Sequence, residues 1–323
     1  MKSALALLGL AVVAVPAQAH ADKHDLVLGR LAAPNSAGTD TVPDGQSFRS
    51  LVSELGVAVA PRLGAPADTR GVSGFSMSAD FGMTSINADR AYWCATEESA
   101  GCAAGQSKGS GYLQTLGLTL RKGLWLPFPS IEFSGGVDAL LGSSMWSGRA
   151  GARLALHEGF HDWPIPAVAI GLQGARLFGS GELDLTTVSF DLTVSKSFGI
   201  ASTVNLSPFA GWNRLWLIPR AQVVDRTPGV DAIVDPSDLN NNFVFPDQSS
   251  IKRDRFFGGL ELRWKTLTLL AEIDVALGGG STYDGPLPLS CDTITNPDML
   301  GGCDAADKSG QQQTYTLSLG TDF

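Results

Sequence analysis

The chain has 323 residues, a formal net charge of −9 at pH 7 and only 17% charged residues. Typical globular domains carry about 25% charged residues, and the acidic balance argues against nucleic acid as a partner. Beyond the N-terminal segment, no uninterrupted run reaches the ~18 apolar residues that a membrane-spanning helix needs. Low charge, 38 glycines and evenly spread aliphatic residues are what a β-barrel with a lipid-facing wall requires.

Residues 1–19 have the features of a secretory signal peptide. Lys2 supplies the positive charge, Ala4 to Val15 form the apolar region, and Pro16-Ala17-Gln18-Ala19 gives a small-x-small cleavage site. The apolar region is too short to cross a bilayer as a helix. We therefore predict that the chain is exported and cleaved after Ala19.

The segment 20–71 has two interpretations. Apolar residues at i, i+3, i+4 and i+7 predict an amphipathic helix, with Asp44 as its N-cap and Gly56 beyond its end. These apolar residues are Phe48, Leu51, Val52 and Leu55. Residues 51–59 also alternate in polarity, and together with residues 26–28 they would supply two further strands. We favour the strands, and a short periplasmic or plugging helix is the alternative.

From residue 72 to residue 323, the sequence repeats a unit of apolar/polar alternation followed by a turn. Alternation with a period of two gives each strand one lipid-facing and one lumen-facing side. In 72–84, for example, Phe75, Met77 and Phe81 oppose Ser76 and Ser78. The predicted fold class is therefore all-β: a transmembrane, antiparallel, up-and-down β-barrel of about 10–12 strands.

Charged residues of both signs lie on the polar side of these predicted strands, where we expect them to line the lumen. They are Asp80, Arg121, Glu132, Asp138, Arg153, Asp191, Glu261, Arg263, Lys265, Glu272 and Asp274. Mixed charge inside a barrel can line an aqueous path, or it can fill a narrow barrel with ion pairs. The glycines at 117, 136 and 151 on the same side leave space, which favours a pore.

The connections and the aromatic residues have the pattern of a membrane barrel. Three connections on one side are long (85–110, 216–255 and 279–312), whereas those on the other side are short. Aromatic residues gather at both ends of the strands, for example Phe198 and Trp264 at one end and Trp146, Phe178 and Trp212 at the other. Rings at both headgroup levels form the aromatic girdles of such barrels.

The chain ends in an alternating strand, residues 315–323, that closes on Phe323. This strand resembles the C-terminal signature of Gram-negative bacterial outer-membrane β-barrels. The resemblance implies an outer-membrane location, contact with membrane lipid, and recognition by the barrel-insertion machinery through Tyr315, Leu317, Leu319 and Phe323. It identifies no functional subfamily. We expect a monomer with no cofactor.

Four cysteines in an exported chain predict disulfides. They form two close pairs, Cys94 with Cys102 and Cys291 with Cys303. Three pairings are formally possible, and closure of these two short loops is the simplest. Neither pair has the Cys-x-x-Cys-like spacing of zinc ligands, so we expect no metal there.

Two motifs of hydrolases occur without their required context. Residues 157–161 match HExxH, which binds zinc only on a helix, but Gly159 and the following Trp163-Pro164 disfavour a helix. Residues 105–109 match GxSxG, but no strand precedes and no helix follows them. The remaining histidines, His20 and His24, lie at the N-terminus, and known barrel enzymes need a histidine at the external rim or on the lipid-facing wall. We predict no enzymatic activity and no catalytic residues.

The favoured function is a narrow porin or channel for small polar solutes. The first alternative is a non-conducting structural or surface-interaction barrel that acts through its extracellular loops. A metal-dependent hydrolase at the HExxH stretch is the least favoured alternative.

Overall fold

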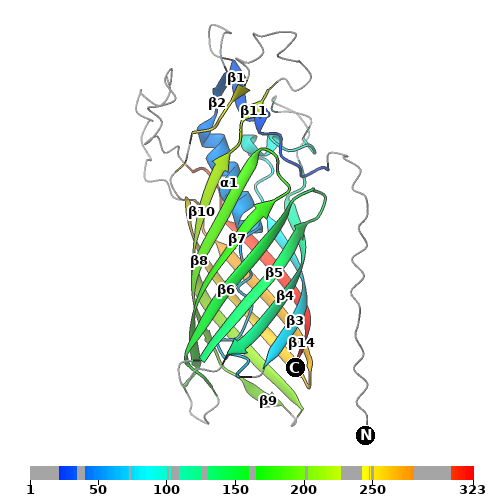
Figure 1. Ribbon diagram of the computed structural model, residues 1–323, viewed down its shortest axis with the longest axis vertical. Helices are drawn as coiled ribbons and strands as arrows, with labels where there is room; N and C mark the ends of the chain where they lie inside the picture. The colour runs from blue at the N-terminus through cyan, green and yellow to red at the C-terminus, as the bar shows by residue number, and fades with distance from the viewer. Residues whose placement is uncertain are drawn as a thin grey trace.

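The protein is a closed antiparallel β-barrel of ten strands (Figure 1). The computed structural model describes residues 22–34, 41–72, 74–99, 102, 109–124, 130–159, 165–200, 203–226, 242–246, 248, 251–279 and 307–323. The predicted signal peptide therefore lies outside the described residues. The barrel strands are β3 (Phe75–Ser85), β4 (Tyr112–Leu124), β5 (Ser130–Leu140), β6 (Trp146–His157), β7 (Ala167–Phe178), β8 (Leu183–Ser195), β10 (Val204–Ala221), β13 (Ile251–Trp264), β14 (Leu267–Ala276) and β15 (Gln312–Asp322).

Each barrel strand pairs with the next one along the chain, and the last strand, β15, pairs with β3 to close the ring, with Leu319 opposite Ala79. A short strand, β9 (Phe198–Ile200), pairs only with the beginning of β10. The preference for twelve strands was therefore wrong. The two additional strands would have come from the segment before residue 72, which has a different structure.

The side chains alternate between the two faces of the wall as predicted. Outward residues such as Leu116 and Leu317 are each 52% exposed, whereas inward residues such as Asp80 and Asp191 are buried. So large an apolar outer surface would be unfavourable in water and is matched to lipid. Closure of the ring leaves no unpaired strand edge in the wall, which a structure that spans a lipid bilayer also requires.

The two ends of the barrel differ. The C-terminus and the short turns lie at one end, which we identify as periplasmic. At the other end, small elements form a layer that we name the cap: η1 (Leu28–Leu31), β1 (Ala32–Pro34), β2 (Thr41–Pro43), η2 (Ala91–Cys94), β11 (Val224–Asp225) and β12 (Asn242–Phe243). The short strands of the cap form two hairpin-like pairs, β1 with β2 and β11 with β12.

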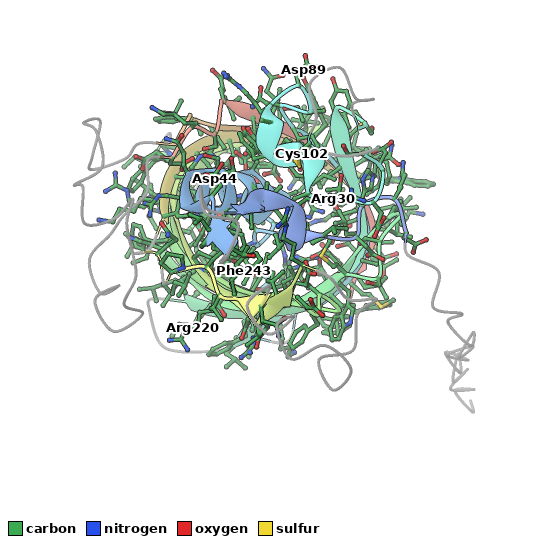
Figure 2. The ribbon with its side chains drawn as sticks, turned by 90° about the horizontal axis from the view of Figure 1, so that it is seen from above. Arg30, Asp44, Asp89, Cys102, Arg220 and Phe243 are labelled. Atoms are coloured by element: carbon green, nitrogen blue, oxygen red, sulfur yellow. A yellow bond between two sulfur atoms is a disulfide. The ribbon has the colours of Figure 1, made fainter. Side chains whose placement is uncertain are left out.

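The one α-helix among the described residues, α1 (Gly45–Ala58), lies inside the ring of strands in its extracellular half (Figure 2). Asp44 caps it as predicted, because its carboxylate accepts a hydrogen bond from Ser47 N at 3.0 Å. The helix replaces the predicted strand 51–59, and Leu28 lies in η1 rather than in a strand. No helix among the described residues is long and apolar enough to cross a membrane.

The physical reason for the helix is its enclosure. Every residue from Phe48 to Ala58 is buried, and inside a closed ring no strand edge remains free to pair with this segment. A helix satisfies its backbone groups internally. Gly56 lies within the helix and not beyond its end. A glycine is needed there for close packing, because a Cβ at this position would lie 2.6 Å from the Leu217 side chain of β10.

Candidate functional site

The lumen of the barrel is filled by the chain's own N-terminal segment. After α1, residues 59–72 continue through the lumen to the periplasmic end, where β3 begins. We name residues 59–72 the thread, and α1 together with the thread the plug. The thread is 14 residues without helix or strand, so its position depends on side-chain contacts with the wall.

The extracellular half of the lumen is apolar and encloses α1. Phe48, Leu51 and Leu55 of the helix are each 1% exposed or less. They belong to a core that includes inward residues at the extracellular ends of the strands, namely Leu113, Leu140, Leu177, Leu185, Leu215, Leu217 and Ile251. Phe48 also stacks on Phe245, which follows β12 of the cap, with ring centroids 4.4 Å apart. Burial of this apolar surface is the main force that holds α1.

Glu54 of α1 is fully buried and connects the helix to two extracellular loops. Its carboxylate accepts hydrogen bonds from Asn87 N (2.9 Å) and Nδ2 (2.5 Å), Tyr92 Oη (2.8 Å), Trp93 Nε1 (2.7 Å) and Gly310 N (3.2 Å). Burial and the adjacent Glu54 charge raise the pKa of Tyr92, so the phenol stays protonated and donates. Five donor groups from two separate loops therefore converge on one carboxylate.

Arg253, on the inner face of β13, forms a second polar contact with α1. Its guanidinium donates to Ser53 Oγ and Ser309 Oγ, both at 2.9 Å, and to Gly310 O at 2.8 Å. Ser53 Oγ in turn donates to Asp307 at 2.8 Å. The buried polar face of α1 is thus hydrogen-bonded to the wall and to the last extracellular loop.

The thread is fixed at mid-lumen by Arg62. Its guanidinium lies 3.6 Å from Asp138 and donates to the Thr115 hydroxyl. Asp138 also pairs with Arg149 at 2.6 Å, and Arg149 pairs with Asp80 at 3.1 Å. Cations and carboxylates therefore alternate from the thread into the wall.

Leu63, the residue after Arg62, packs against apolar side chains on the inner wall. It is 1% exposed and clusters with Phe209, Phe257 and Leu270. The two phenylalanine rings can point inward because Gly211 and Gly259 lie beside them, where a Cβ would collide with the rings.

The periplasmic end of the thread is fixed by Arg70. Arg70 pairs with Glu261 at 3.0 Å and with Asp322 at 2.7 Å, and its backbone N donates to Glu132 at 3.1 Å. Arg263 pairs with the same two carboxylates, at 2.9 and 3.0 Å. Between Arg62 and Arg70, the wall arginines Arg121 and Arg153 donate to thread carbonyl oxygens.

The predicted luminal residues lie on the inner face of the wall, with one exception. The exception is Lys265, which lies in the turn after β13 with a φ of 55° and places Nζ 5.7 Å from the Trp264 ring. The prediction for Lys265 was wrong, because β13 ends at Trp264 and the alternation stops there. Those on the inner face are Asp80, Arg121, Glu132, Asp138, Arg153, Asp191, Glu261, Arg263, Glu272 and Asp274.

Little open space remains in the described lumen. A cavity of about 30 Å³ lies between the thread and the wall, beside Arg62, Arg70, Arg121 and Glu272. This space is large enough for only a few water molecules.

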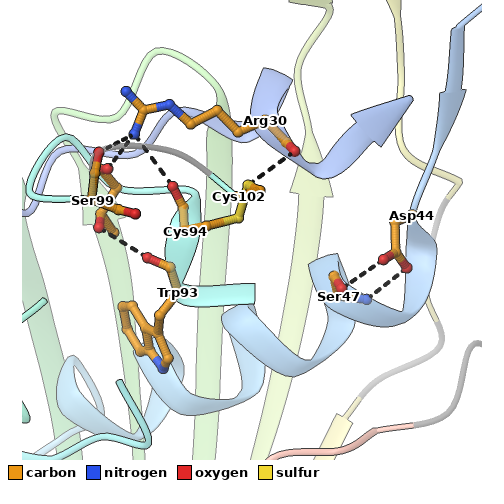
Figure 3. Close-up of a disulfide and its surroundings, with 8 residues drawn as sticks. Arg30, Asp44, Ser47, Trp93, Cys94, Ser99 and Cys102 are labelled. Atoms are coloured by element: carbon orange, nitrogen blue, oxygen red, sulfur yellow. Dashed lines mark hydrogen bonds between the residues drawn. A yellow bond between two sulfur atoms is a disulfide. The ribbon is translucent and has the colours of Figure 1, made fainter. Parts of the chain in front are cut away.

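The cap is closed by a disulfide and by Arg30 (Figure 3). Cys94 is bonded to Cys102, as predicted, with Cα atoms 4.9 Å apart. Arg30 Nη1 donates to the carbonyl oxygens of Cys94 (3.3 Å), Thr96 (2.5 Å) and Ser99 (3.0 Å), which ties η1 to the disulfide loop. The second predicted pair, Cys291 and Cys303, lies outside the described residues.

The HExxH stretch begins at a strand end and not in a helix. His157 is the last residue of β6, its Nδ1 lies 2.9 Å from Glu158 O, and Glu158 accepts a hydrogen bond from the Thr69 hydroxyl. His161 and most of the GxSxG stretch lie outside the described residues. No group of His, Cys, Asp and Glu side chains that could hold a metal ion occurs within the part of the chain that the structure describes.

The sequence interpretation missed several residues that organise the site. Arg149, Arg253 and Arg255 continue the inward phase of their strands, so an extension of the alternation would have found them. The apolar residues in the same phase near the extracellular ends, such as Leu113 and Leu215, were a signal that something apolar fills the lumen. No local sequence pattern identifies Arg62 or Arg70 as residues that contact the wall.

The architecture indicates the class of protein. The closed ring, apolar outer wall and terminal strand are features of one class of membrane protein. This chain has the fold of a bacterial outer-membrane β-barrel. No family model and no curated protein matches it.

Several solved outer-membrane barrels resemble it in fold. The translocator domain of the autotransporter NalP from Neisseria meningitidis is 9% identical, over 86% of this chain and 96% of that one, with a TM-score of 0.35. Ail, the attachment invasion locus protein of Yersinia pestis, is 10% identical over 78% and 99% (TM-score 0.28). Outer-membrane expressed OmpT of Vibrio cholerae is 10% identical over 78% and 77% (TM-score 0.28).

Proposed function

We propose that the protein is a closed outer-membrane barrel that holds its own N-terminal segment in the lumen and presents the cap at the cell surface for interaction with a partner. The observation that carries this proposal is the passage of the thread through the lumen, with Arg62 and Arg70 paired to wall carboxylates at two heights. A porin needs a continuous water-filled path. The filled lumen therefore supports the closed barrel over the narrow porin that the lumen charges predicted.

The cap supports the interaction part of the proposal. It is tied together by the Cys94–Cys102 disulfide and by Arg30, so its described surface is pre-organised. A pre-organised surface loses less conformational entropy when it binds a partner. The cap is joined to α1 through Glu54, so the plug also supports the cap from below.

Single-channel conductance in a planar bilayer tests the closed lumen. We expect the refolded wild-type protein to be silent, and the double variant Arg62→Met/Arg70→Met to show brief openings because the thread is then released. The control is Lys122→Met/Lys265→Met, which removes two charges outside the lumen and should stay silent. Steps in the wild type that scale with salt concentration would contradict the proposal and restore the porin.

Labelling of single cysteines tests the position of the cap. Val42 in β2 is 45% exposed, so Val42→Cys should react with a membrane-impermeant maleimide on intact cells. Lys265→Cys, at the opposite end, should react only after the outer membrane is permeabilised. Protection of Val42→Cys in intact cells would place the cap in the periplasm and refute the proposed orientation.

A further inference from the structure

In the extracellular half of the outer wall, charged side chains are confined to one sector of the barrel. Outward positions in the extracellular halves of β14, β15, β3, β4, β5 and β6 are uncharged, for example Gln313, Ser85 and Gln114. The four consecutive strands β7, β8, β10 and β13 differ. Their outward residues include Arg176, Asp184, Arg214, Arg220, Lys252 and Asp254. We name Arg176, Arg214, Arg220 and Lys252 the basic sector.

The basic sector lies at and above the outer edge of the apolar wall. Val204 pairs with Trp264 at the periplasmic end of β10 and β13. From Val204 to Arg214, at about 3.3 Å per residue and a tilt of about 40°, β10 rises by about 25 Å, which is the height of the apolar band of such barrels. Lys252, opposite Trp216, lies slightly higher. Arg220 lies higher still and points away from the barrel (Figure 2).

Two cations of the sector are held in place by neighbours on the wall. Arg214 donates to Asp254 through Nε and Nη2, both at 2.9 Å, and lies 5.5 Å from the Trp212 ring. Arg176 donates to Asp184 at 2.7 Å and lies 6.0 Å from the Phe178 ring. These contacts neutralise two positive charges and orient both guanidinium groups at the level of the aromatic girdle.

The other two cations leave an excess of positive charge. Arg220 lies opposite Asp184, whose carboxylate accepts from Arg176, and Lys252 lies opposite Trp216. The side chains of Arg220 and Lys252 are exposed and form no ion pair with the described residues. Below them, outward apolar residues such as Leu260 and Leu192 are 41% and 39% exposed on the outer wall.

We propose that the basic sector binds the phosphorylated headgroup of an outer-leaflet glycolipid. Arginine and lysine are the side chains that bind phosphate, and the aromatic and aliphatic wall directly below them matches acyl chains. A soluble anion would use the cations alone. A lipid would contact the cations with its headgroup and the apolar wall below them with its acyl chains. The adjacency of these two surfaces therefore favours a lipid.

Native mass spectrometry of the full chain in mild detergent tests the proposal, with diphosphorylated lipid A as the probe. The test variant is Arg220→Gln/Lys252→Gln, which leaves both ion pairs of the sector intact. The matched control is Lys122→Gln/Lys265→Gln, which removes the same charge at the periplasmic end. Heat-modified electrophoretic mobility verifies that each variant is folded.

We expect the wild type and the control to retain the probe equally and the test variant to bind it about 25-fold more weakly, at roughly fivefold per cation. Dephosphorylated lipid A should bind weakly to all three proteins. Equal binding of the probe by the test variant, or equal binding of the dephosphorylated lipid, would overturn the proposal. Full displacement of the probe by millimolar inorganic pyrophosphate would also overturn it, because the site would then select a soluble anion.

Discussion

The two parts of the plug are held in the barrel by different forces. α1 lies among apolar side chains, and Leu51 and Leu55 are each 1% exposed or less. The thread depends mainly on Arg62 and Arg70 and their wall carboxylates. Burial of a leucine contributes about 1.5–3 kcal/mol, whereas the gain from a buried ion pair is largely offset by desolvation. We therefore expect α1 to be the stable part and the thread to be the part that loosens first.

Glu54→Ala should have the largest effect on the plug. It leaves five hydrogen-bond donors without their acceptor, and we expect a loss of about 3–5 kcal/mol in the docking of α1 and the cap. The measurement is the urea midpoint for protease resistance of the cap in detergent. Glu54→Gln keeps one carbonyl oxygen and should lose less. Equal midpoints for Glu54→Ala and the wild type would show that the converging donors do not stabilise the cap.

Leu55→Ala tests whether apolar burial holds α1. The cavity left at this buried position should cost about 2–4 kcal/mol, read from the same urea midpoint. Leu116→Ala is the matched control, because Leu116 is 52% exposed on the outer wall and the same truncation there should change little. A larger effect at Leu116 than at Leu55 would contradict the comparison.

Arg70→Met should loosen the thread and leave α1 in place. We expect amide hydrogen exchange at residues 68–72 to accelerate by about 10- to 100-fold, which corresponds to roughly 1–3 kcal/mol of local opening. Exchange in α1 should stay unchanged. Equal acceleration in both parts would mean that the plug opens as one unit and that the distinction drawn between them is wrong.

Removal of the Cys94–Cys102 disulfide should affect only the cap. Its loop is short, with a sequence separation of 8, so we expect Cys94→Ser/Cys102→Ser to destabilise the η2 region by about 2–3 kcal/mol. Faster proteolysis there, with an unchanged heat-modified mobility of the barrel, would confirm this. A shift in barrel unfolding would show that the cap and wall unfold together.

The smallest effect expected is a pH dependence of the cap through His24. Burial, with a contribution from the charge of Lys23, lowers the pKa of His24 below its usual 6.5, although Glu98 and Asp25 act in the opposite direction. A lowered histidine pKa means that the unfolded segment binds the proton more tightly. The stability contributed by His24 is therefore present above about pH 6.5 and is lost as the pH falls.

Protease cleavage within residues 22–31 should accordingly accelerate as the pH falls below 6.5, and His24→Gln should abolish that acceleration. Burial raises the pKa of Glu182, which accepts from Leu28 N at 2.5 Å, and this acts with the opposite sign. The difference between the wild type and His24→Gln isolates the histidine. An identical pH profile for both proteins would exclude His24 as the cause.

The wall could be predicted from the sequence because the orientation of each side chain depends only on the alternation within its own strand. In a strand between lipid and lumen, each residue has one environment, so alternation such as Phe75, Met77 and Phe81 against Ser76 and Ser78 determines which face points outward. The Asp44 cap and the Cys94–Cys102 pair are also local features, and the structure agrees with both. The strand ends were predicted less well, because β10 continues to Ala221 and β13 begins at Ile251, both inside the predicted connection 216–255.

Only the tertiary structure decided what fills the lumen. Residues 48–55 carry a helical pattern and residues 51–59 an alternating one, and the closed ring selects the helix because no free strand edge is available. Arg62 and Arg70 receive their partners from strands that are distant in sequence: Asp138, Glu261 and Asp322. Local pattern therefore determined the barrel, whereas the occupant depends on long-range charge pairing and enclosure, which exist only once the ring has closed.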